Sequence, residues 1–279
     1  SPHGIGAFGA AAYRFVDFLA EAGQRWWQVL PLGPTSFGDS PYQSFSAFAG
    51  NPYFIDLDLL CEEGLLRPEE YRNITWGEKL GLVDYGILYK HREPVLRKAF
   101  ARFKDQAALD AFATENKFWL ENYALYRAIK TAQNQRPWTE WDEALRKREP
   151  EALRRAKLSY ATDIRYHIFV QYQVFKQWHA LRRYAQKKGV QIIGDIPYYV
   201  SMDSADVWQN VRFFQLDEQA QAAEVAGCPP DGFSPEGQLW GNPLYNWDAL
   251  EKDEYRWWLA RINASFSLFD VLRIDHFRG

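Results

Sequence analysis

The sequence predicts an α/β fold built around a parallel sheet. Three short apolar runs, at 26–32, 190–197 and 269–275, have the length and composition of core strands, and amphipathic helical stretches separate them. The second and third runs end in charged residues. Strand–helix–strand units are right-handed crossovers that place successive strands side by side in parallel. In a barrel of parallel strands, catalytic groups lie at the carboxyl ends of the strands.

Composition excludes several classes of protein. Charged residues make up 25% of the 279 residues and the net charge is −3, so nothing points to nucleic acid or an anionic membrane. No apolar run approaches the ~20 residues of a membrane span. Cys61 and Cys228 lie far apart without a secretory leader, so we expect a reduced, cytoplasmic protein.

Aromatic residues are abundant, at 17% of the chain with 12 Trp and 16 Tyr. So many flat side chains are typical either of a heavy core or of a site that stacks on sugar rings. The histidines outside the last strand are scattered without the spacing of metal ligands, and we expect no metal and no cofactor.

The first segment, residues 1–55, holds a helix, a strand and a long loop. A Gly-rich start precedes a helix whose apolar stripe ends at Gly23: Phe15, Val16, Phe18, Leu19 and Ala22. The run WWQVLPLGP reads as a strand that leads into a loop at 35–53. That loop is too long to be a simple connection, so we expect it to be functional.

Residues 56–160 are mostly helical and predict a subdomain inserted between two strands. Leu96, Phe100 and Phe103 keep one apolar stripe, and Pro68, Pro94 and Pro137 are expected to interrupt the helices.

The third segment, residues 161–279, begins within a long predicted helix at 160–188. The strand VQIIGDIP follows, then a helix start at 204–208, the loop AGCPPDGFSPEGQLWGNPLY, a helix at 253–266 and the last strand.

The last strand lies in FDVLRIDHFRG, at 269–279. Alternation places Val271, Arg273 and Asp275 on one face. Burying Arg and Asp together is costly unless the charges pair or take part in chemistry, and an adjacent Arg keeps a carboxylate ionised, which suits a nucleophile. A structural ion pair is the alternative.

Asp195 ends the preceding strand. Two carboxylates at neighbouring strand ends favour glycoside cleavage, although each could instead cap the following helix.

The motifs IIGDIPYYV, DSADVW, AGCPPDGFSPEGQLWGNPLYNW and LRIDHFRG resemble those of the 4-α-glucanotransferases of glycoside hydrolase family 77. SPHGIG, WWQVLPLGPT and SPYQSFSAFAGNPYFIDL resemble the opening segments of the same family, and the likeness is weakest from about 60 to 160. It implies a (β/α)8 TIM barrel of the α-amylase type, of which only strands two to four are present, with a helical insertion between strands two and three.

The resemblance also assigns roles. Asp275 matches the nucleophile, Arg273 the residue that keeps it ionised, and His276 and Asp195 contacts to the reacting glucose. Tyr42 matches the aromatic platform under that sugar. The remaining residues expected to bind substrate are Ser40 in the same SPYQ motif, and Phe233, Trp240 and Asn242 in or after an acceptor-side loop at 229–237.

The implied activity is transfer of α-1,4-glucan segments between chains by a retaining double displacement. Maltooligosaccharides and α-1,4-glucans are the expected partners. The family's acid/base Glu and a further Asp lie on later strands, so we expect a piece of a longer enzyme that needs the remainder of its barrel and does not turn over substrate alone. An α-glucan hydrolase and a catalytically incomplete carbohydrate-binding fragment remain alternatives. The glucan chain length and the oligomeric state stay open.

Overall fold

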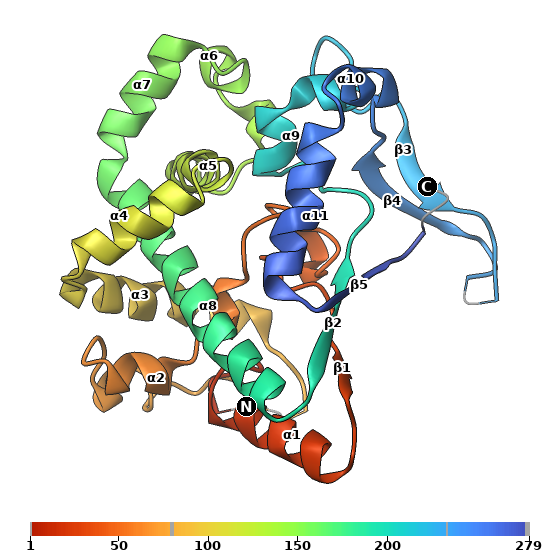
Figure 1. The fold of residues 1–279 in the computed structure, drawn as a ribbon. Coiled ribbons are helices and arrows are strands. Elements are labelled where there is room, and N and C mark those ends of the chain that lie inside the picture. Colours follow the sequence, from red (N-terminus) through yellow and green to blue (C-terminus); the bar gives the residue numbers. More distant parts are fainter. Residues whose placement is uncertain (1, 79–80, 233, 277–279) are drawn as a thin grey trace.

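A computed structural model describes residues 2–78, 81–232 and 234–276, and its centre is a parallel sheet (Figure 1). The strands are β1 (Trp26–Gln28), β2 (Gln191–Ile196) and β5 (Val271–Ile274), in the order β1-β2-β5. Both pairs are parallel, and the register sets Asp195 of β2 opposite Arg273 of β5. The three predicted strands and their parallel arrangement are therefore confirmed.

Helices occupy most of the chain between β1 and β2. They are α2 (Leu57–Glu62), α3 (Tyr85–Arg102), α4 (Gln106–Glu115), α5 (Leu120–Ala132), α6 (Glu143–Arg146), α7 (Pro150–Ser159) and α8 (Ala161–Lys187). In Figure 1 this group lies on one side of the sheet. Buried apolar residues form one cluster that includes residues of all three predicted segments, and the boundaries of those segments stay a prediction.

The long helix α8 holds the backbone at both ends of the segment 50–56, where the long loop after β1 leads into α2. Its apolar side carries Phe169, Val174, Trp178 and Leu181, all buried. On the same helix the buried amide of Gln171 donates to the carbonyl of Gly50 and accepts from its N–H, at 2.9 and 2.8 Å. Gln177 holds the backbone of Asp56 in the same way, at 3.2 and 2.7 Å. These paired hydrogen bonds satisfy the loop backbone without a sheet.

Two details of the predicted helices are wrong. Pro94 lies inside α3 and does not end it, because Val95, Leu96 and Ala99 are buried and tertiary packing outweighs the local cost of proline. The first helix, α1 (Ala10–Glu21), buries Val16 and Leu19 but leaves Phe15 and Phe18 exposed.

The segment after β2 also differs from the prediction. The helix at 204–208 is confirmed as α9 (Ala205–Gln209), and Ser204 caps it by accepting from the N–H of Val207. The helix expected at 253–266 is confirmed as α11 (Arg256–Leu268). The short helix before it, α10 (Trp247–Lys252), was not predicted, and Glu254 and Tyr255 separate the two with positive φ. Left-handed residues cannot continue an α-helix.

The expected Gly/Pro-rich loop is partly a β-ribbon. β3 (Val225–Cys228) pairs antiparallel with β4 (Gln238–Pro243). A Cβ on Gly227 would lie 2.4 Å from the carbonyl oxygen of Gln238, so the close approach of the strands requires glycine there. Within the described residues, none of the helices has the length and apolarity needed to traverse a bilayer.

Candidate active site

The carboxyl ends of β2 and β5 bring together three charged side chains. Arg273 donates from one terminal nitrogen to Asp195 Oδ2 at 3.1 Å and from the other to Asp275 Oδ2 at 2.6 Å. The register explains the first contact, because Asp195 and Arg273 are paired residues on adjacent strands. The i, i+2 spacing along one face explains the second.

Burial divides these three residues in an unexpected way. The side chain of Asp195 is 0% exposed, whereas those of Arg273 and Asp275 are 41% and 45% exposed. The premise that Arg273 and Asp275 are both buried is therefore wrong. The face of β5 that carries Val271 and Arg273 is the more exposed one, so the Arg273–Asp275 pair is open to solvent and to a ligand.

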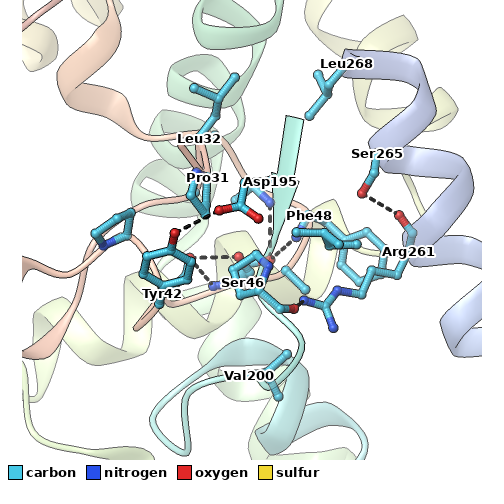
Figure 2. A pocket seen from close by; sticks show the side chains of 18 of the residues that line it. Pro31, Leu32, Tyr42, Ser46, Phe48, Asp195, Val200, Arg261, Ser265 and Leu268 are labelled. Atoms are coloured by element: carbon cyan, nitrogen blue, oxygen red, sulfur yellow. Dashed lines mark hydrogen bonds between the residues drawn. The ribbon is translucent and has the colours of Figure 1, made fainter. Parts of the chain in front are cut away.

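Tyr42 joins the charged group from the long loop after β1. Its hydroxyl donates to Asp195 Oδ2 at 2.8 Å, as Figure 2 shows. Desolvation, followed by the hydrogen bond and the charge of Asp195, raises the pKa of Tyr42 to about 12. The phenol is therefore a neutral donor at ordinary pH. Asp195 does not cap the following helix, as the alternative reading supposed, since Ser204 does so.

Asp275 is held as a carboxylate. Desolvation raises its pKa, but the N–H of His276, at 3.0 Å from Oδ1, the charges of Arg273 and His276 and the Arg273 hydrogen bond outweigh it. The net direction of the pKa is downward. The His276 N–H and the expected pairing with Arg273 together keep Asp275 ionised, which is the state that a nucleophile requires.

A cavity of about 510 Å³ opens beside these groups. Its lining includes most of the side chains predicted from the sequence: Ser40, Tyr42, Trp240, Asn242, Asp275 and His276. Trp240, on β4, packs against the ring of His276 with the ring centroids 4.6 Å apart. Asp195 and Arg273 do not line this cavity, but each is hydrogen-bonded to a residue that does, Asp195 to Tyr42 and Arg273 to Asp275. Phe233 lies outside the described residues. Among those described, no group of three or more His, Cys, Asp or Glu residues is placed to hold a metal ion.

Gln43 connects two walls of the cavity and was not singled out from the sequence. Its amide nitrogen donates to the carbonyl of Trp240 at 3.0 Å and to Asn242 Oδ1 at 2.9 Å. Tyr198 and Tyr199 line the same cavity and were also missed. Their signals were available, since Gln43 belongs to the quoted SPYQ motif and the tyrosines directly follow the strand that carries Asp195.

The arrangement supplies the parts of a site for a polyhydroxylated ring. An accessible carboxylate is oriented by an arginine, and aromatic side chains and amides surround it. Aromatic faces stack on apolar ring surfaces, while amides and phenols bond to hydroxyl groups.

Comparisons with known proteins agree with this geometry. All of residues 1–279 match the profile of glycoside hydrolase family 77, described as 4-alpha-glucanotransferase. The chain is 49% identical over 280 residues to the 4-alpha-glucanotransferase of Clostridium butyricum, covering 99% of this chain and 58% of that one. With the Thermus thermophilus 4-alpha-glucanotransferase the identity is 50% over 284 residues, covering 100% and 56%.

The structure superimposes on that of the amylomaltase from Streptococcus agalactiae in complex with acarbose. The TM-score is 0.96 at 48% identity, over 100% of this chain and 57% of that one. The chain thus spans little more than half the length of the relatives it matches. The match along its full length shows that the chain belongs to glycoside hydrolase family 77, the 4-α-glucanotransferases.

Proposed function

We propose that the whole protein is a 4-α-glucanotransferase that moves α-1,4-glucan segments between chains, with Asp275 as the nucleophile. The observation that carries this is the position of Asp275 at the carboxyl end of β5. There Arg273 orients the carboxylate and the aromatic-lined cavity gives it access to a sugar. Tyr42 serves as the platform under the reacting glucose, and His276, Trp240, Asn242 and Ser40 as further sugar contacts.

In the first step Asp275 attacks the anomeric carbon, the glycosidic C–O bond breaks, and the leaving oxygen takes a proton from an acid. Asp195 is poorly suited to be that acid, because its buried Oδ2 already accepts hydrogen bonds from Tyr42 and Arg273. Asp275 is the only carboxylate among the described residues that line the cavity. We therefore assign the acid to the remainder of the protein, and predict that residues 1–279 alone do not turn over substrate.

In the second step a sugar hydroxyl replaces the leaving group, attacks the glycosyl ester, and returns a proton to the base. Net retention follows from the two inversions. Transfer in place of hydrolysis requires the acceptor side to hold a sugar and exclude water. Trp240 and the β3–β4 ribbon supply an aromatic wall beside His276, which favours transfer over the rival hydrolase activity.

The same proposal includes the fold of the complete protein. We propose that β1, β2 and β5 are strands two to four of a (β/α)8 barrel, that the helices at 56–160 are an insertion between strands two and three, and that the rest of the barrel completes the sheet. Maltooligosaccharides and α-1,4-glucans are the proposed substrates. The cytoplasmic location stays a prediction.

The test is to incubate the full-length protein with maltotriose and resolve the products by chromatography. Transfer yields glucose together with maltooligosaccharides longer than three units, whereas hydrolysis yields only shorter sugars. Asp110→Asn is the matched control for the Asp275→Asn variant, because Asp110 is an exposed carboxylate of the insertion that pairs with Arg165. Failure to form any longer product with wild-type protein would refute the proposal.

A further inference from the structure

One wall of the candidate cavity is a backbone segment held by side chains. Residues 197–204 connect β2 to α9, and Ile196, Pro197, Tyr198 and Tyr199 all line the cavity. Asn242 donates to the carbonyl of Val200 at 2.8 Å. The Trp138 indole donates to the carbonyl of Met202 at 2.8 Å. The shape of this wall therefore depends on donors from distant parts of the chain.

Arg261 supplies two further donors to this segment. It lies on α11 with 1% exposure. One terminal nitrogen donates to the carbonyl of Tyr198 at 3.1 Å and the other to the carbonyl of Pro197. The hydroxyl of Tyr245 donates to the same Tyr198 carbonyl at 2.7 Å and accepts from Arg261 at 3.2 Å. Two consecutive peptide groups are thus fixed two residues after Asp195.

A buried guanidinium is a costly way to hold two carbonyls. Arg261 has no ion pair within 4.0 Å among the described residues, and its Nε has no hydrogen-bond partner there. Its counter-charge is the buried Asp206, whose pKa burial raises and the Arg261 charge lowers without direct contact. Removing the guanidinium from water carries a desolvation penalty, which the two carbonyls and the charge of Asp206 offset in part. The Arg261 guanidinium also contacts the rings of Trp257 and Trp258, with its Cζ 5.5 and 4.9 Å from the ring centroids.

The location of Arg261 connects this cost to the candidate site. It lines a small cavity together with Asp195, Tyr42 and Ser46 (Figure 2). Asp195 Oδ1 is buried and also has no partner among the described residues. The turn that Arg261 holds therefore begins two residues after Asp195 and forms part of the cavity wall.

We propose that Arg261 is a positioning residue for the reaction, with Tyr245 as its partner. It fixes the turn at Pro197 and Tyr198, and through that turn the placement of Asp195 and the cavity wall at Tyr199. Arg261 itself does not touch substrate. This inference rests on the proposed function for its kinetic consequences, but the rigidity of the turn is measurable without any substrate.

The test uses the full-length protein and three variants. Arg261→Met removes the donors, Arg261→Lys keeps the charge with fewer donors, and Arg256→Met is the matched control. Arg256 lies on the same helix with its side chain 69% exposed. Because small misplacements of reacting groups cost on the order of 10² in rate, Arg261→Met should lower kcat for maltotriose by about that factor with KM within threefold. Arg261→Lys should recover part of the loss, and the control should match wild type.

Amide hydrogen exchange of the peptide covering 198–203 supplies the readout that is independent of activity. It should exchange faster in Arg261→Met than in wild type or Arg256→Met. Tyr245→Phe keeps the ring and Arg261 but removes both hydrogen bonds of the hydroxyl, to the Tyr198 carbonyl and from Arg261. It should lower kcat by about three- to tenfold with only a small fall in Tm. Unchanged exchange in folded Arg261→Met, or unchanged kcat in Tyr245→Phe, would overturn the proposal. If wild-type protein shows no transfer, the proposed function fails and the exchange data still decide the positioning role.

Discussion

Replacing Arg273 by lysine separates the shape of the cation from its charge. Arg273 uses two nitrogens to hold two carboxylates, Asp195 at 3.1 Å and Asp275 at 2.6 Å. A lysine ammonium is a point charge without this planar fork, so it cannot reproduce both hydrogen bonds in the same geometry. A charge-assisted hydrogen bond contributes about 1.5–3 kcal/mol. Since the Arg273 side chain is 41% exposed, solvent screening favours the lower figure.

A loss of about 1.5 kcal/mol corresponds to about a tenfold fall in kcat/KM for Arg273→Lys. The assay is the initial rate of longer-oligosaccharide formation from maltotriose by the full-length protein, with Tm measured in parallel. Arg212→Lys is the control, because Arg212 forms a surface ion pair with Asp253 at 3.0 Å and should be silent. A value for Arg273→Lys within twofold of wild type would refute the reasoning that the fork orients Asp275.

Asp275→Asn in the full-length protein should abolish transfer at unchanged Tm, and near-normal turnover would rule out Asp275 as the nucleophile. Tyr42→Ala should reduce kcat/KM more than Tyr42→Phe, yet Tyr42→Phe should still cost several-fold because the phenol donates to Asp195; identical activity of Tyr42→Phe and wild type would argue against a role for that bond. Burial raises the pKa of Asp206 to about 6. Because the folded-state pKa is raised, the protonated carboxyl stabilises the folded protein fully below the unfolded pKa, and this contribution is lost as pH rises through about 6. In urea unfolding, the free energy of unfolding of Asp206→Asn relative to wild type should therefore rise by about 2–3 kcal/mol between pH 4 and 7.5. A pH-independent difference would contradict the assigned pKa.

The sequence determined the local elements with strong periodicity. The three parallel strands and α8 were predicted because alternation and the 3.6-residue repeat are written in neighbouring residues. The charges at the strand ends were equally visible: once β2 and β5 are adjacent and parallel, Asp195 and Arg273 follow as neighbours from register alone. The family motifs then marked most of the residues that line the cavity.

Only the tertiary structure decided which distant segments meet. Tyr42 reaches Asp195 across 153 positions, and Gln43 reaches Asn242 across 199. The β3–β4 ribbon forms where composition indicates a loop, and α3 continues through Pro94. Arg261, on α11, donates to a carbonyl in the turn after β2. These features depend on packing and hydrogen bonds between remote groups, whose free energy outweighs local preference. A pattern confined to neighbouring residues therefore carries no trace of them.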